Sequence, residues 1–156
     1  MMQRRIPIQY QGRTCDTRVL VQKDGKGEWN VTGMGTRIGR RHLIVSNLAK
    51  GASAMRTEQF IQAYLHRDPE PIRREIEKIS LLIVQRLEER YGRFVEFGLD
   101  LGITPDGSFQ LIEANSKPDR KIFLRTGQLS AYREAIRRPI EYHLYLCRQM
   151  ELPKVE

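Results

Sequence analysis

The sequence predicts an α+β fold in which helices pack on an antiparallel sheet, and three features lead to this prediction. Two stretches, residues 18–38 and 97–115, alternate like strands on either side of a glycine-containing turn, as β-hairpins do. Between them, residues 71–91 repeat apolar side chains at helical spacing. The 156 residues contain no internal repeat and no interdomain linker, so we expect one domain with its own core.

The amino-terminal part of the chain predicts strands. The first dozen residues are expected to be extended, without a partner in this chain. RVLVQK at 18–23 alternates as a strand, DGKG at 24–27 reverses the chain, and 28–38 forms the return strand. Because an isolated hairpin is only marginally stable, it needs another strand or a helix against it. HLIVSNL at 42–48 is the predicted third strand.

Two helices are predicted in the middle of the chain. A short helix covers 57–66, with Thr57 as its candidate N-cap. A long helix covers 71–91, where Pro71 suits the first turn and Gly92 ends the helix. This long helix should pack on the second hairpin through one apolar face, formed by Ile72, Ile76, Ile79, Ile83 and Leu87.

The carboxy-terminal part predicts a loop and then a helix. Residues 117–127 are polar and rich in basic side chains, so they are expected to form a loop. Residues 128–150 follow a helical pattern. Pro139 should either kink this helix or start its last segment, because proline lacks the N–H that a helix interior needs.

The second hairpin carries the candidate site. If its loop has an even number of residues, Asp100 faces Glu113 and Gly102 faces Leu111 across the two strands. Asn115 lies two residues beyond Glu113 and therefore on the same face. The glycines on that face leave room for a ligand. The opposite face should belong to the core, and its members are Leu99, Leu101, Ile103, Ile112 and Ala114.

Two acids placed opposite one another repel, and a divalent cation would remove that repulsion. The oxygen atoms of Asp100, Glu113 and Asn115 are ligands suited to Mg²⁺, which also keeps waters and phosphates in its shell. Two alternatives remain open. The acids could simply point into water. Pro-Asp-Gly at 105–107 also favours a three-residue loop with a bulge, which would put Asp100 opposite Ile112.

Composition limits the class of protein. About 40% of the residues are hydrophobic and 29% charged, as in soluble globular proteins. The net charge of +8 suggests anionic partners, but no aromatic platform accompanies the arginines, which argues against nucleic acid. The two cysteines fit a reducing compartment. The first residues resemble no signal peptide and no run is long enough to span a bilayer, so we expect a cytoplasmic protein without a membrane partner.

Three stretches in this order carry a resemblance to a known family. They are DTR at 16–18 leading into VLVQKDGKGEW, then Arg37 followed by VSNLAKG at 45–51, and finally GLDLGI with LIEANSKP. Together they resemble the carboxy-terminal half of an ATP-grasp domain, in particular the spore-coat-associated YheC/YheD family. The resemblance runs from about residue 10 to about residue 150 and so covers nearly the whole chain.

The resemblance implies a nucleotide site. Asp100, Glu113 and Asn115 would hold Mg²⁺ against the phosphates of ATP. The phosphate and acyl-phosphate site would be lined by Arg18, Arg37 and Asn47, with the two arginines as catalytic residues. The implied reaction is an ATP-dependent ligation of a carboxylate substrate to an amine or thiol. Without the resemblance, both arginines would be read as surface residues of strands, and Asn47 as the cap of a turn.

The implied domain is partial. Residues 1–15 would be an extended leading segment, 16–127 the nucleotide- and metal-site core, and 128–156 a carboxy-terminal helix. The glycine-rich phosphate loop and the lysines of the other ATP-grasp lobe are expected to be absent, because only fifteen residues precede Asp16. A second chain could supply that lobe. The alternative is a non-catalytic structural or binding protein of the spore coat that retains the fold.

The chain departs from the family pattern at two positions. It has Gly51-Ala52 where the family usually has two glycines, which is expected to stiffen a loop near the substrate. It has Asp119 where the family has a glycine after the proline, which adds a negative charge beside the proposed metal. Neither departure removes a proposed ligand.

Overall fold

The computed structural model describes residues 8–41 and 52–151 and confirms the α+β fold. Within these residues the strands form one antiparallel sheet in the order β4-β3-β2-β5-β6, with β1 also paired to β2. The strand bounds are β1 (Gln9–Tyr10), β2 (Arg13–Lys23), β3 (Trp29–Arg41), β4 (Ser53–Met55), β5 (Glu96–Ile103) and β6 (Phe109–Asn115).

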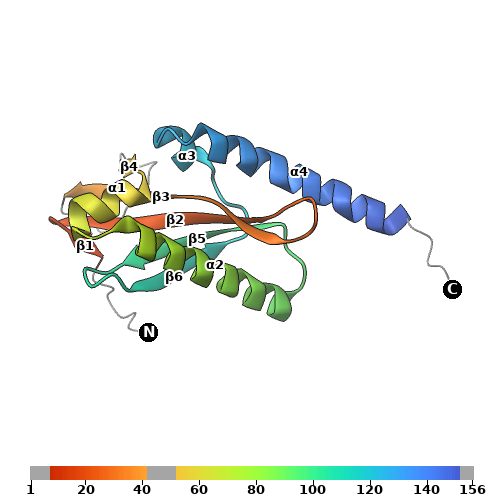
Figure 1. The fold of residues 1–156 in the computed structure, drawn as a ribbon, viewed down its shortest axis with the longest axis horizontal. Coiled ribbons are helices and arrows are strands. Elements are labelled where there is room, and N and C mark those ends of the chain that lie inside the picture. Colours follow the sequence, from red (N-terminus) through yellow and green to blue (C-terminus); the bar gives the residue numbers. More distant parts are fainter. Residues whose placement is uncertain (1–7, 42–51, 152–156) are drawn as a thin grey trace.

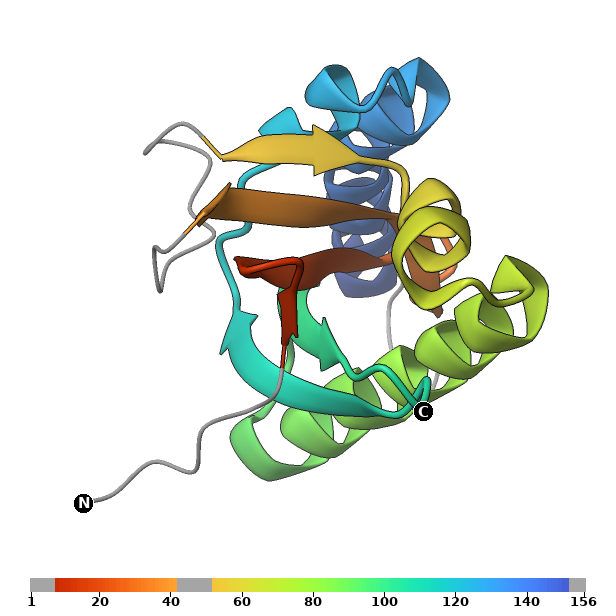
Figure 2. The same cartoon turned by 90° about the vertical axis from the view of Figure 1, so that its left-hand side faces the viewer.

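Helices cover both faces of the sheet (Figure 1). Along the chain they are α1 (Thr57–Phe60), which continues into the π-helical turn η2 (Ile61–Leu65), then α2 (Pro69–Tyr91), α3 (Lys121–Arg125) and α4 (Leu129–Glu151). The view along the sheet in Figure 2 separates α2, below the strands, from α3 and α4, which lie together above. The molecule is therefore a three-layer arrangement with the sheet in the middle.

Strand β2 shows how the two faces are divided. Val19 and Val21 are completely buried and belong to the larger core cluster, which includes α1, η2 and α2. Leu20 points the other way and packs with Phe123 of α3 and Ala135 of α4. Because side chains alternate along a strand, a single central strand thus fills both cores. Every residue of β2 after Arg13 is buried.

The amino-terminal segment has a strand partner, so the prediction of an unpaired extended segment was wrong for its second half. Strand β1 pairs with the start of β2, and the hydroxyl of Tyr10 donates to the carbonyl of Ile103 at 2.6 Å. This long-range contact ties β1 to the end of β5. The first predicted hairpin is confirmed, but β2 begins at Arg13, before the predicted start at residue 18. The strand predicted at 42–48 lies outside the described residues.

The long helix is confirmed, but it begins two residues before the predicted start. Asp68 is the N-cap, since its side chain accepts from the backbone N–H of Glu70 at 3.1 Å, and Pro69 occupies the first turn. The short helix is also present, but Thr57 does not cap it. The N-cap is Arg56, and buried Thr57 instead contacts Thr36 on β3 through their hydroxyls.

The predicted loop at 117–127 contains a short helix, α3. Ile122 and Phe123 of α3 are buried against the sheet, which explains why the segment is ordered as a helix despite its basic composition. The carboxy-terminal helix α4 is confirmed as one continuous helix with Pro139 inside it. Neither long helix of the described residues combines the length and apolar character needed to cross a membrane.

The register of the β5–β6 hairpin combines two irregularities. The loop at 105–107 has three residues, with Gly107 at φ 88°, so Ile103 pairs with Phe109. A bulge at Ile112 then shifts the register by one residue. The odd number of loop residues and the extra residue at the bulge offset each other, and Asp100 lies opposite Glu113 as predicted.

Other parts of the hairpin prediction were wrong. Gly102 pairs with Gln110 and not with Leu111, because it lies on the loop side of the bulge. The predicted core residues of β5 are buried, but Ile112 and Ala114 of β6 are exposed. Strand β6 forms the edge of the sheet and is exposed along most of its length.

Candidate functional site

The candidate site is a row of side chains that crosses the sheet on the face covered in part by α3. Strand pairing sets Arg18 of β2 opposite Gly35 of β3 on one side and opposite Asp100 of β5 on the other. Glu113 of β6 continues the row beyond Asp100. Directly opposed residues in an antiparallel pair share a face, so one face carries a positive side chain followed by two acids.

A second pair lies beside this row. Asp16 is two residues before Arg18, on the same face of β2, and is paired in register with Arg37 of β3. The four side chains of Asp16, Arg18, Arg37 and Asp100 therefore meet across three strands. We refer to these four residues as the ion-pair cluster.

Hydrogen bonds hold the ion-pair cluster together. Arg18 grips Asp100 with two donors, Nε to Oδ1 at 2.5 Å and Nη2 to Oδ2 at 3.0 Å. The Nη2 of Arg37 lies 2.8 Å from Oδ2 of Asp100. Arg37 also donates to Oδ2 of Asp16, from Nε at 2.8 Å and from Nη2. Both carboxylate oxygens of Asp100 are thus bound by guanidinium groups.

Three members of the ion-pair cluster are buried, Arg37 is half-buried, and the formal charges of the four balance. Asp16 and Asp100 are 4% and 5% exposed, and Arg18 is 8% exposed. Burial lowers the pKa of Arg37, but the hydrogen bonds and charges of Asp16 and Asp100 more than offset this, so its pKa lies above the usual value. A buried charge is tolerated only when it is paired, and here two cations meet two anions.

Small residues let other segments approach this face closely. A Cβ on Gly98 would lie 2.6 Å from Cβ of Pro118 and 3.1 Å from Nη1 of Arg18. A Cβ on Gly35 would lie 2.9 Å from Ile122 of α3. The space above Gly98 and Gly35 is therefore occupied by the protein's own side chains. The prediction that they leave room for a ligand does not hold at Gly98.

The other two predicted metal ligands lie near the exposed end of the row. Glu113 is exposed. Asn115 lies opposite Gly98 and its Oδ1 accepts from the backbone N–H of Lys117 at 2.8 Å. This contact fixes the amide and leaves the second lone pair of Oδ1 for another partner.

The donor set fits a hard cation. Asp100, Glu113 and Asn115 offer only oxygen atoms, the ligand type that Mg²⁺ prefers. Over residues 8–41 and 52–151 no group of three or more His, Cys, Asp or Glu side chains gathers as a metal cluster. The predicted set has two acids and one amide, so its role as a metal site stays a prediction. Asn47, the third predicted phosphate ligand, lies outside the described residues.

Sequence reasoning gave Asp16 no role of its own. The available signal was its position two residues before Arg18, since residues at that spacing share a strand face. It also missed Arg120, whose Nη2 binds both carboxylate oxygens of Glu96 at 2.7 and 2.6 Å and whose Nε donates to the carbonyl of Ala135. Arg120 thereby ties the segment after β6 to β5 and α4.

Comparisons with known proteins agree with one another. Residues 1–146 match the family model described as YheC/D like ATP-grasp. The endospore coat-associated protein YheC of Bacillus subtilis (strain 168) is 32% identical over 111 residues, covering 71% of this chain and 31% of YheC. The endospore coat-associated protein YheD of the same organism is 32% identical over 143 residues, covering 89% of this chain and 30% of YheD. The chain spans less than a third of the length of either relative.

Proposed function

Because the chain belongs to the YheC/D-like ATP-grasp family, we propose that it provides the Mg²⁺- and phosphate-binding part of an ATP-dependent carboxylate ligase site. The single observation that carries this proposal is the row in which Arg18, Asp100 and Glu113 stand side by side on adjacent strands. Such a row offers a guanidinium group to phosphate and carboxylates to a cation on one face of the sheet.

The proposed chemistry is phosphoryl transfer from ATP to a carboxylate, followed by capture of the acyl phosphate by an amine or thiol. Negative charge develops on the transferring phosphoryl group, so catalysis depends on positioning and electrostatic stabilisation. Arg18 and Arg37 would bind and orient the phosphate oxygens through their planar donor groups. Asp100, Glu113 and Asn115 would hold Mg²⁺, which when bound neutralises charge on the phosphates.

Completion of the site by another lobe is part of the proposal. In both matched relatives, the part of the chain outside the aligned region is more than twice as long as the aligned region itself. Residues 8–41 and 52–151 of this chain include no glycine-rich loop of the phosphate-binding kind. We therefore expect the chain alone to bind Mg²⁺–ATP weakly and to hydrolyse none of it.

Calorimetric titration with Mg²⁺–ATP tests the proposal. Glu113→Gln removes one proposed ligand at an exposed position, so the fold should tolerate it. We expect affinity to fall by about tenfold or more, equivalent to about 1.4 kcal/mol per factor of ten. Asp100→Asn should have a similar or larger effect.

Glu89→Gln is the matched control, because Glu89 is 63% exposed on α2 and pairs with Arg86, away from the sheet row. It makes the same chemical change and should leave affinity unchanged. Equal Mg²⁺–ATP binding by the wild type and by the Asp100→Asn, Glu113→Gln double variant would refute the proposal.

A second candidate function is a non-catalytic role in the spore coat. It is favoured by the names of both relatives, which are endospore coat-associated proteins, and by the ion-pair cluster, whose balanced charges could serve the fold alone. Under this candidate, Mg²⁺–ATP would not bind to the wild type.

A further inference from the structure

The arginines of the candidate site and its central acid bind one another. Arg18 occupies both oxygens of Asp100, and Arg37 contacts the Oδ2 atom as well. A carboxylate held in this way has its lone pairs directed at N–H donors. A cation that approached Asp100 would also meet two guanidinium charges within the same buried cluster.

We propose that Arg18 and Arg37 act as an internal gate on cation binding: they keep a divalent cation off Asp100 until a phosphate-like anion draws them away. This inference rests on the proposed function, since it concerns the same residues. Metal and phosphate then bind cooperatively, because each removes the partner that blocks the other. Neither the metal alone nor the phosphate alone produces the state in which the cation is bound to Asp100 and the anion to the arginines.

The two arginines are not equivalent in this exchange. Within the described part of the chain, the ion pairs formed by Arg18 all go to Asp100. Arg37 keeps Asp16 as a second partner, through donors from both Nε and Nη2. Arg18 therefore loses its carboxylate when a cation takes Asp100, whereas Arg37 stays anchored. We infer that Arg18 is the main gate and that Asp16 is a positioning residue for Arg37.

Charge balance supports the exchange. In the ion-pair cluster, two acids neutralise two arginines. Removing Arg18 from Asp100 leaves a buried carboxylate short of one partner, and a divalent cation with an anion restores the balance. A cation without an anion leaves an uncompensated guanidinium beside the metal, which is unfavourable in a buried place.

Titration with Mn²⁺ alone, followed by the electron paramagnetic resonance signal of free Mn²⁺, tests the gate without any enzymatic readout. Arg18→Gln should bind Mn²⁺ more tightly than the wild type. The expected gain is about 5- to 150-fold, the usual range for coupled sites. Arg37→Gln should give a smaller gain, because it leaves the two-donor grip of Arg18 intact.

Sulfate supplies the second half of the test, as a tetrahedral anion that binds Mn²⁺ weakly in solution. At constant ionic strength, sulfate should raise the Mn²⁺ affinity of the wild type and have little effect on Arg18→Gln. The matched control is Arg133→Gln, which removes the same charge from an exposed position on α4 and should behave like the wild type in both titrations.

Three outcomes separate the gate from the function it rests on. If the wild type and Arg18→Gln bind Mn²⁺ equally and sulfate changes neither, the gate is wrong, while Mn²⁺–ATP binding that depends on Glu113 still supports the proposed function. If no variant binds Mn²⁺, with or without ATP, both are wrong. If Arg18→Gln fails to fold, the sulfate effect on the wild type decides, and its absence overturns the gate.

Discussion

At the scale of residues, Arg18 accounts for the placement of two acids opposite each other. Like charges across a ladder are destabilising by a few tenths to about 1 kcal/mol. Asp100 is flanked by Glu113 on β6 and by Arg18 on β2. The guanidinium neutralises the buried acid, and Glu113 is exposed to water. The opposed acids are thus compatible with a stable fold before any cation binds.

Gly98 is a position where one methyl group should disturb the candidate site. Because its Cβ would lie 2.6 Å from Pro118 and 3.1 Å from Arg18, Gly98→Ala must push both away. We expect a loss of about 1–3 kcal/mol in the free energy of unfolding, measured by denaturant titration.

Gly25→Ala is the control for that substitution. A Cβ at Gly25 would first meet Cβ of Glu141 at 3.4 Å, an ordinary contact, and Gly25 is not among the glycines with positive φ. Its effect on unfolding should be small. Equal destabilisation by the two alanines would show that close packing at Gly98 is not the cause.

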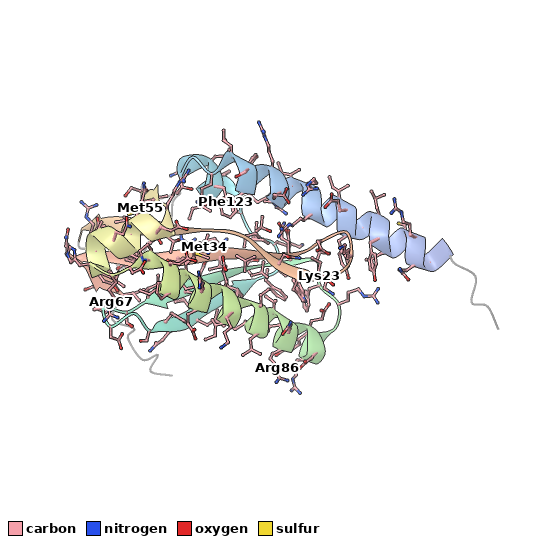
Figure 3. The ribbon with its side chains drawn as sticks, viewed as in Figure 1. Lys23, Met34, Met55, Arg67, Arg86 and Phe123 are labelled. Carbon is pink, nitrogen blue, oxygen red and sulfur yellow. The ribbon has the colours of Figure 1, made fainter. Side chains whose placement is uncertain are left out.

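At the scale of elements, Glu88 fastens α2 to the β2–β3 hairpin. Its carboxylate accepts from Nζ of Lys23 at 2.5 Å and from Nε1 of Trp29 at 2.8 Å. Lys23 and Arg67, which precedes α2, lie toward opposite ends of the sheet (Figure 3). Glu88 therefore secures the far end of the long helix, while Asp68 caps its start.

The tie at Glu88 should make stability depend on pH. Burial raises the pKa of Glu88, but hydrogen bonds from Lys23 and Trp29 more than offset this, so its pKa lies below the ordinary value of 4.5. A lowered folded-state pKa gives stability that is present above about pH 4.5 and is lost as pH falls through the folded-state pKa. Glu88→Gln should cost about 1–3 kcal/mol at pH 7.

Denaturant unfolding at pH 7 and pH 3 measures this effect. The difference between the wild type and Glu88→Gln should shrink at pH 3, because the stabilisation is lost as the pH falls through the lowered folded-state pKa of Glu88. Glu89→Gln, on the exposed side of the same helix turn, should match the wild type at pH 7. A difference for Glu88→Gln that is equal at both pH values would contradict an ionic role for Glu88.

The sequence predicted elements well where a local pattern determines them. The long helix and both hairpins have periodic apolar residues and turn residues of their own. Helix α3 could not be predicted, because its five residues supply just two buried apolar side chains, and packing on the sheet orders it. Tyr10 of β1 also contacts the end of β5, at a separation of 93 residues that no local pattern encodes.

The candidate site was predicted in part. The opposition of Asp100 and Glu113 followed from hairpin arithmetic, although the loop and the bulge each departed from the assumed geometry. The grip of Arg18 on Asp100 could not be predicted, since it requires β2 to lie beside β5, and the two residues are 82 positions apart. Strand order is set by long-range packing of the whole sheet.

At the scale of the whole molecule, the central strand should be the most protected part. Strand β2 pairs with β3 and β5 along most of its length and is buried between two helical layers. Amide hydrogen exchange at Val19 to Val21 should therefore report global unfolding, typically about 5–15 kcal/mol for a domain. Amides of edge strand β6 should exchange faster.

Exchange measured by nuclear magnetic resonance on the wild type checks this order of protection. The β5 amides that pair with β2 serve as the internal reference, because they belong to the same sheet as β6 and are buried. Protection of β6 equal to that of β2 would mean that the outer edge of β6 is covered in solution.

The bulge at Ile112 also has a consequence for how this hairpin tolerates a one-residue deletion. It divides the β5–β6 pairing into a part next to the turn and a part away from the turn, and the two parts differ in register by one residue. If the part next to the turn loses one residue, the bulge at Ile112 can disappear, and Asp100 still pairs with Glu113. The loss of one residue at the turn would thereby leave the pairing of the two acids unchanged.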